Sequence, residues 1–161
     1  MPFITAQQVH GNRVAVVTAA TEDGCLAACD GLVTNRANIC LGIYVADCCA
    51  VYLFDPVHSA IGLVHSGRKG TALAIVTNAI ETMKEKFETN PADLVVQLSP
   101  CIRPPHYEID FASEIAAQCR SSGVTQINDS GACTACDPAR YYSYRAEKGR
   151  TGRMLALLAL Q

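Results

Sequence analysis

The sequence predicts an α+β fold in which two sheets stack on each other and helices cover the outside, and three observations support this. Half of the 161 residues are hydrophobic and 17% are charged, so the chain can bury a sizeable core. Its length fits one domain, residues 1–161. Short apolar runs typical of strands recur along the chain, whereas only about two segments have helical periodicity.

Short apolar runs bounded by turn residues predict the strands. Residues 13–18 form the first run, and a turn at Asp30-Gly31 precedes the second, at residues 32–34. Residues 40–55 contain two buried strands that meet at residues 46–50, so polar chemistry can lie at this junction. Further strands are predicted at residues 60–65, 94–98, 124–127, 141–145 and 154–160.

Two helices are predicted, one after residue 70 and one after Asp110. The first follows from apolar residues at helical spacing, which are Leu73, Val76, Ile80, Met83 and Phe87. It ends at Asn90-Pro91. Asp110 can cap the second helix, and Gly123 can terminate it.

Charge and cysteine content restrict the class of function. A net charge of −2 argues against a broad surface for nucleic acid or anionic membrane. No apolar run approaches the roughly 18 residues of a membrane span. Nine scattered cysteines without a secretory leader predict free thiols in a reducing, cytoplasmic compartment rather than a disulfide scaffold.

Cys133 and Cys136 form a CxxC motif, which is compatible with a redox pair or with half of a zinc site. A second CxxC does not occur in the sequence, and neither cysteine begins an amphipathic helix. A loop that carries two incidental thiols is therefore the favoured interpretation.

Three metal-capable side chains lie at or beside the ends of predicted strands: His10 in QVHG, Cys48 in ADCC and His65 in VHSG. Catalytic zinc commonly takes three such protein ligands and keeps its fourth position for water or substrate. Thiolate and imidazole also suit copper, so the residue types leave both Zn²⁺ and Cu²⁺ open. The three residues are dispersed, and a cysteine in an apolar strand is more often a small buried hydrophobe.

Polar residues next to these three suggest supporting roles. Arg68 and Lys69 follow His65 in a glycine-containing turn before the first helix, where backbone N–H groups and positive charge can bind an anion. The alternative is a solvated basic turn. Asp47 precedes Cys48 and could orient a ligand, assist as a base, or cap the turn between the strands.

One family shares an ordered set of segments with this chain, namely QVHG, DGLVTN, LGIYVADCCAVYLFDP, AIGLVHSGRKG, SPCI with a following YEID, and CT followed by YYSYR and TGR. The set resembles the laccase-domain (YfiH-like) family and extends from about Gln7 to the C-terminus. Its members were once described as multicopper polyphenol oxidases and are now regarded as zinc-dependent purine nucleoside phosphorylases with adenosine deaminase activity.

The resemblance implies a layered α/β/β/α sandwich, N-terminally shortened here because typical members have a substantial segment before QVHG. It implies His10, Cys48 and His65 as metal ligands, and a metal-bound water or phosphate as the reacting group. Its implied substrates are a purine nucleoside and phosphate. The chain departs from the family's usual HAGWRG in having Arg68 in place of the Trp and Lys69 in place of the Arg.

Three other functions remain open. A copper-binding polyphenol oxidase is the alternative within the family, although four histidines are few for a multicopper enzyme. A metal-free hydrolase would use Cys48 as nucleophile and His65 as base. A catalytically degenerate protein would keep the metal site without turnover. A shortened N-terminus that exposed apolar surface would favour a homo-oligomer, but no residue demonstrates one.

Overall fold

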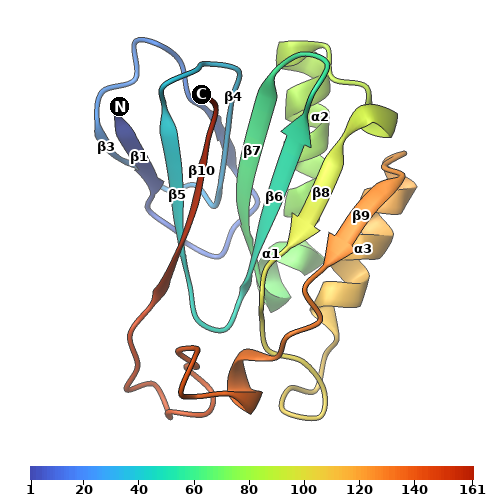
Figure 1. Cartoon of the computed structure of the whole chain (residues 1–161). Helices are drawn as coiled ribbons and strands as arrows, with labels where there is room; N and C mark the ends of the chain where they lie inside the picture. Colours follow the sequence, from blue (N-terminus) through green and yellow to red (C-terminus); the bar gives the residue numbers. More distant parts are fainter.

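Two β-sheets pack face to face in the computed structural model, which describes residues 1–161, and the helices lie on the outer side of the larger sheet (Figure 1). The smaller sheet has the strand order β10-β5-β1-β3, and the larger has the order β2-β4-β7-β6-β8-β9. This architecture confirms the predicted α+β fold of stacked sheets with outer helices. Within residues 1–161 the outer face of the smaller sheet has no helix over it (Figure 1).

The element bounds follow. The smaller sheet contains β1 (Phe3–Ala6), β3 (Gly24–Leu26), β5 (Cys40–Val45) and β10 (Met154–Ala159). The larger sheet contains β2 (Val14–Val16), β4 (Gly31–Thr34), β6 (Cys49–Asp55), β7 (Ala60–Ser66), β8 (Val95–Leu98) and β9 (Gln126–Asp129). The helices are α1 (Arg68–Ala72), α2 (Ile75–Phe87) and α3 (Phe111–Ser121), with 3₁₀ turns η1 (Pro91–Asp93) and η2 (Thr134–Cys136).

Side chains of the central strands alternate between two hydrophobic cores. Leu63 of β7 packs between the sheets with Ile43, whereas the next residue, Val64, packs with Ile80 on the helical side. Successive side chains of a strand point to opposite faces, and both faces of β7 are covered, so the whole strand is buried. Burial on both faces explains why the sequence here is a continuous apolar run rather than an alternating one.

Two connections cross from one sheet to the other at the same end of the sandwich. Residues 46–48 join β5 of the smaller sheet to β6 of the larger sheet, and residues 7–13 join β1 to β2. The antiparallel register of β6 and β7 pairs Cys49 with Ser66, so the end of β7 lies beside the start of β6. This topology brings the sequence neighbourhoods of His10, Cys48 and His65 together.

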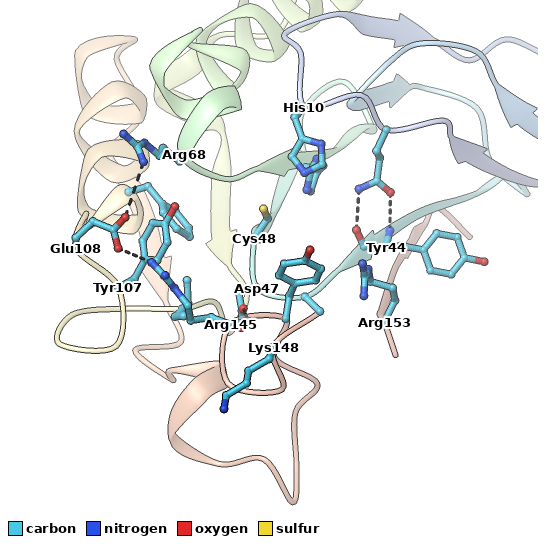
Figure 2. Close-up of a pocket in the computed structure, with 16 residues that line it drawn as sticks. His10, Tyr44, Asp47, Cys48, Arg68, Tyr107, Glu108, Arg145, Lys148 and Arg153 are labelled. Atoms are coloured by element: carbon cyan, nitrogen blue, oxygen red, sulfur yellow. Dashed lines mark hydrogen bonds and ion pairs between the residues drawn. The ribbon is translucent and has the colours of Figure 1, made fainter. Parts of the chain in front are cut away.

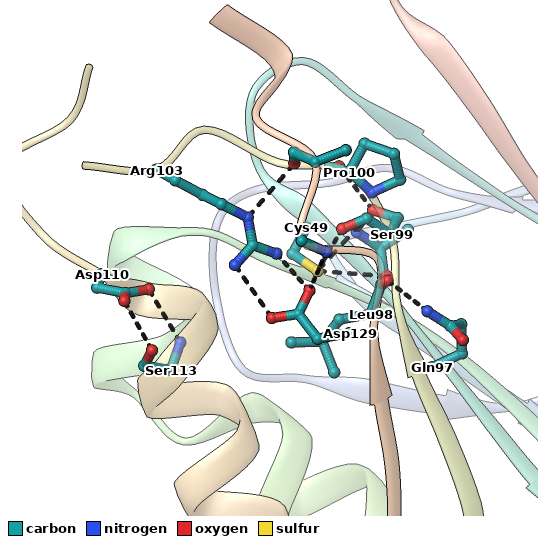
Figure 3. Close-up of polar contacts among 12 residues, drawn as sticks. Cys49, Gln97, Leu98, Ser99, Pro100, Arg103, Asp110, Ser113 and Asp129 are labelled. Carbon is teal, nitrogen blue, oxygen red and sulfur yellow. Dashed lines mark hydrogen bonds and ion pairs between the residues drawn. The ribbon is translucent and has the colours of Figure 1, made fainter. Parts of the chain in front are cut away.

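The helices agree with the sequence except at one residue. The Asp110 side chain accepts a hydrogen bond from the Ser113 backbone N–H (3.0 Å) and caps α3 (Figure 3), and Gly123 follows its end with a φ of +98°. Leu73 was expected on the buried face of the first helix, but it is 50% exposed. The chain turns between α1 and α2, where Ala74 has a φ of 56°, and the turn removes Leu73 from the helical face.

Three strand predictions need correction. The strand expected at residues 124–127 is β9, which begins two residues later at Gln126. Residues 141–145 do not form a strand, because a bend at Tyr141 and an irregular stretch lead into a turn that begins at Tyr144. The short strands β1 and β3 were not predicted. Both lie in the smaller sheet, where long-range parallel pairing rather than local sequence pattern defines them. No helix is long and apolar enough to span a membrane.

We predict that Leu63→Ala lowers the free energy of unfolding by about 2–5 kcal/mol, because it leaves a cavity between the two sheets. The matched control is Leu157→Ala in β10, whose side chain is 51% exposed and whose truncation should cost far less. Urea denaturation of the two variants measures the difference. Equal losses would contradict this description of the core.

Candidate functional site

A cavity of about 910 Å³ opens at the end of the sandwich where the connections cross between the sheets (Figure 2). Its wall is drawn from five parts of the chain: the loop after β1, the β5–β6 junction, the end of β7 with the start of α1, the segment leading into α3, and residues 144–153. His10, Cys48 and His65 are among the lining residues.

The structure brings the three predicted metal-capable residues together. One ligand atom from each of His10, Cys48 and His65 lies within 4.8 Å of the others. The His10 and His65 rings meet edge to face, with centroids 4.9 Å apart. His65 and Cys48 are largely enclosed, whereas His10 is exposed on the cavity side.

A buried carboxylate, Asp30, fixes the positions of both histidines. Its Oδ1 accepts hydrogen bonds from the His10 backbone N–H (2.9 Å) and from Nδ1 of His65 (2.8 Å). Its Oδ2 accepts from the backbone N–H groups of Val9 (3.0 Å) and Gly11 (2.9 Å). Burial opposes ionisation of Asp30, but the hydrogen bonds from His65 and the loop outweigh it and lower the pKa of the carboxyl.

The same contacts shape the electrostatics of His65 and Cys48. Burial disfavours the charged imidazole, yet hydrogen bonds to Asp30 and Cys48 outweigh it and raise the pKa of His65 to about 9. Burial likewise disfavours the Cys48 thiolate, but hydrogen bonds with His10 and His65 lower the pKa of its thiol to about 7. Cys48 therefore differs from two buried cysteines: a hydrogen bond with Cys49 and burial raise the pKa of Cys101, and burial raises the pKa of Cys119.

Gly67 allows Cys48 to approach the end of β7. A Cβ at position 67 would lie 2.2 Å from the Cys48 sulfur, a distance that no side chain can occupy. The glycine in HSGRKG thus makes room for the thiol rather than providing flexibility.

This donor set fits a metal ion. Two imidazoles and one thiol, from two connections and the end of β7, match the three-ligand sets of catalytic zinc sites, which leave a fourth position open. Because Nδ1 of His65 is held by Asp30, its Nε2 is the nitrogen free to ligate. A carboxylate that orients a ligating histidine is a common feature of zinc centres. Histidine and thiolate also bind copper, so the donors alone do not identify the metal.

Asp47 ties the C-terminal segment to the cavity. It is buried, and its Oδ1 accepts a hydrogen bond from the Thr134 hydroxyl (2.7 Å), while its Oδ2 accepts from the Arg145 backbone N–H (2.8 Å). Both carboxylate oxygens are therefore engaged. Asp47 therefore holds Thr134 and Arg145 in place, which is a contact that none of the three sequence interpretations of Asp47 included.

A set of charged side chains forms the outer wall of the cavity (Figure 2). Glu108 contacts Arg145 (2.6 Å) and Arg68 (3.8 Å), and Lys148 and Arg153 also line the wall. Arg145 additionally stacks over the Tyr107 ring at 5.0 Å from its centroid. Lys69, the second candidate anion-binding residue, is exposed and is not among the lining residues.

Sequence reasoning missed Asp30, Thr134, Glu108 and Arg145. Asp30 was interpreted only as part of a turn, because its partners are 19 to 35 residues distant in sequence. Arg145 lay in a segment expected to be a structural strand. The available signal was the YYSYR segment, which is one of the segments that carry the family resemblance and which contains this arginine.

Comparison with known proteins shows the family to which the chain belongs. A family model described as multi-copper polyphenol oxidoreductase laccase matches residues 1–118 and 106–161. The chain belongs to this laccase-domain family.

Relatives and solved structures agree with this assignment. The chain is 30% identical over 197 aligned positions to the purine nucleoside phosphorylase YlmD of Bacillus subtilis, which covers 99% of this chain and 71% of that protein. The crystal structure of YfiH from Bacillus licheniformis matches with a TM-score of 0.93 at 28% identity over 99% of this chain and 74% of that one. YlmD from Geobacillus stearothermophilus matches with a TM-score of 0.92 at 26% identity, covering 99% and 73%.

One part of the cavity wall falls where the laccase-domain match is divided. The two matched segments overlap at residues 106–118, which include Tyr107, Glu108 and Phe111 of the wall. The alignment with the B. subtilis protein also runs over 197 positions, more than the 161 residues of this chain. The relative therefore has internal residues without a counterpart here.

We predict that Asp30→Asn lowers the free energy of unfolding by about 2–3 kcal/mol, because an amide nitrogen would face a hydrogen-bond donor at one of the two oxygen positions. Asp137→Asn is the matched control, since Asp137 is exposed and its side chain makes no hydrogen bond. Chemical denaturation monitored by circular dichroism compares them. A loss no greater than that of the control would show that Asp30 does not anchor the site.

Proposed function

We propose that this chain is a zinc-dependent purine nucleoside phosphorylase that also deaminates adenosine, with His10, Cys48 and His65 as the metal ligands. The observation that carries the proposal is the convergence of these three side chains at a cavity whose wall is rich in cations. The names of the similar proteins support the substrate class, because they are purine nucleoside phosphorylases.

Copper chemistry of the multicopper type is less compatible with the histidines. His10 and His65 lie at the cavity, whereas His58 pairs with Asp55 (3.0 Å) and His106 is exposed in a turn. Residues 1–161 thus offer one mixed His/Cys group rather than a blue-copper centre with a separate histidine-rich cluster. One metal ion suits this arrangement.

The chain's own residues would bind and orient the substrates. Zinc at the three ligands would supply a Lewis acid with an open position and would lower the pKa of a bound water toward neutrality. Tyr107 and Tyr144 line the cavity and offer aromatic faces for a purine. Arg68 and Arg145, both at the wall, would hold phosphate through their guanidinium groups.

Phosphorolysis then needs alignment more than covalent help from the protein. A phosphate oxygen forms a bond to C1′ of the nucleoside while the C1′–N9 bond breaks, and the purine takes up the electron pair and a proton. Asp47 would contribute by holding the Arg145 backbone in place. Deamination would use the same cavity without phosphate: water adds at C6 of adenosine, ammonia leaves, and inosine forms.

We expect the protein, once loaded with zinc, to contain close to one zinc ion per chain. When phosphate is present, it should produce ribose 1-phosphate and free base from inosine or adenosine. Without phosphate, adenosine should give inosine and ammonia. Cys48→Ser removes a ligand and should lower both rates by more than about 100-fold, together with the zinc content. Chromatographic product analysis and elemental analysis measure these quantities.

The matched control is Cys25→Ser, because Cys25 is exposed in β3 and does not line the cavity. It should retain zinc and both activities. If the unmodified chain converts nucleosides no faster than Cys48→Ser does, the enzymatic proposal is refuted. Near-stoichiometric zinc without turnover would indicate the degenerate metal-binding protein, and copper with a blue absorption band would indicate the oxidase.

Glu108 should weaken phosphate binding, because its carboxylate forms ion pairs with the guanidinium groups of Arg68 and Arg145. Glu108→Gln removes the competing charge and should lower the KM for phosphate by up to about fivefold, as expected for exposed ion pairs worth less than about 1 kcal/mol. Steady-state kinetics with varied phosphate tests this. Glu85→Gln on the exposed face of α2 is the control, and a raised phosphate KM in Glu108→Gln would contradict the assignment.

A further inference from the structure

The CxxC motif lies on a hydrogen-bonded turn of the backbone. Cys133 caps the 3₁₀ turn η2, Cys136 is its last residue, and the Cys136 backbone N–H donates to the Cys133 carbonyl (3.2 Å). Residues i and i+3 of a 3₁₀ turn are eclipsed and separated by a rise of roughly 6 Å. That separation lies within the Cα range of roughly 4.4–6.8 Å found in disulfides.

Exposure distinguishes this pair from the buried cysteines of the core, and spacing distinguishes it from the exposed Cys25. Cys136 is exposed and Cys133 is partly exposed, whereas Cys49, Cys101 and Cys119 are buried. Burial opposes ionisation of Cys133, but hydrogen bonds from Cys136 and from backbone groups of the turn outweigh it and lower the pKa of its thiol. Cys133 is therefore the better nucleophile, and Cys136 is placed to resolve a mixed disulfide.

The surrounding contacts hold the turn on both sides. The Thr134 N–H donates to the Cys101 carbonyl (3.2 Å), and the Cys101 N–H donates to the Ala132 carbonyl (3.2 Å). Arg103 pairs with Asp129 and donates through Nε to the Ala132 carbonyl (3.3 Å) (Figure 3). The backbone that carries both cysteines is thus anchored by hydrogen bonds on two sides.

The turn is also connected to the cavity. Thr134 lies between the two cysteines, is fully buried, and donates its hydroxyl to Oδ1 of Asp47 (2.7 Å). The other oxygen of Asp47 holds the Arg145 N–H. Disulfide formation would fix the two sulfurs at roughly 2.05 Å from each other, and the accompanying movement would fall on the turn that carries Thr134.

We propose that Cys133 and Cys136 are a redox modification site, which a low-molecular-weight disulfide such as glutathione disulfide converts to an intramolecular disulfide that loosens the Asp47 contacts. Cys133 thiolate attacks one sulfur of the small disulfide, whose S–S bond breaks and releases one thiol. Cys136 thiolate then attacks the Cys133 sulfur of the mixed disulfide and releases the second thiol. The protein loses two hydrogens and two electrons, and the small disulfide becomes two thiols.

The test uses the full chain incubated with glutathione disulfide and then digested with trypsin under conditions that block free thiols. Cleavage after Arg120 and Arg140 releases residues 121–140, which contain only Cys133 and Cys136. We expect this peptide to lose two hydrogens and to regain them on reduction. Cys136→Ser should instead leave one glutathionyl group on Cys133, and Cys40→Ser in β5 should behave like the unmodified chain.

Amide hydrogen exchange tests the connection to the cavity without reference to catalysis. Oxidation should speed exchange in residues 141–148, which contain the Arg145 N–H held by Asp47, and Cys136→Ser should abolish this response. Cys133→Ser serves the same purpose if Cys136→Ser does not fold. The proposal is overturned by glutathionylation of residues 121–140 without hydrogen loss, by a cross-link from Cys133 to Cys101, or by unchanged exchange in residues 141–148.

Discussion

The buried carboxylate of Asp30 is the interaction on which the geometry of the site depends. An ionised carboxylate removed from water costs several kcal/mol unless hydrogen bonds replace its hydration. Here the replacements are three backbone N–H groups of residues 9–11 and the ring of His65. The groups that offset the desolvation of Asp30 are therefore the same groups that must be placed for His10 and His65 to face Cys48. The same four hydrogen bonds therefore stabilise this part of the fold and set the geometry of the site.

The sandwich supplies the second requirement, which is that connections from different sheets meet. Cys48 lies on the crossing from β5 to β6, and His10 lies on the crossing from β1 to β2. Asp47 extends this arrangement by holding Thr134 and Arg145, which come from the C-terminal part of the chain. The cavity thus lies where these connections meet the ends of strands from the two sheets, and its lining residues come from several separate parts of the chain.

The sequence predicts best the elements whose pattern reflects burial on both faces. Strands β5, β6 and β7 are continuous apolar runs, and His65 and Cys48 are recognisable as polar residues at their ends. Strands β1 and β3 escape prediction because parallel partners distant in sequence define them. Asp30 escapes for a similar reason, since the four groups that hydrogen-bond to its carboxylate are distant in sequence. Residues 141–145 have an alternating aromatic pattern, but contacts with Asp47 and turns, rather than a strand ladder, determine their backbone.

The charge around the cavity favours one function of this family over another. Arg68, Arg145, Lys148 and Arg153 line the wall, while the two carboxylates there are already engaged, Asp47 with Thr134 and the Arg145 backbone and Glu108 with two guanidinium groups. The charge of a divalent metal cation at His10, Cys48 and His65 would be larger than the single negative charge of a Cys48 thiolate. With the metal bound, the cavity would have a positive potential that attracts an anionic co-substrate such as phosphate, whereas a neutral phenol would not be attracted by it.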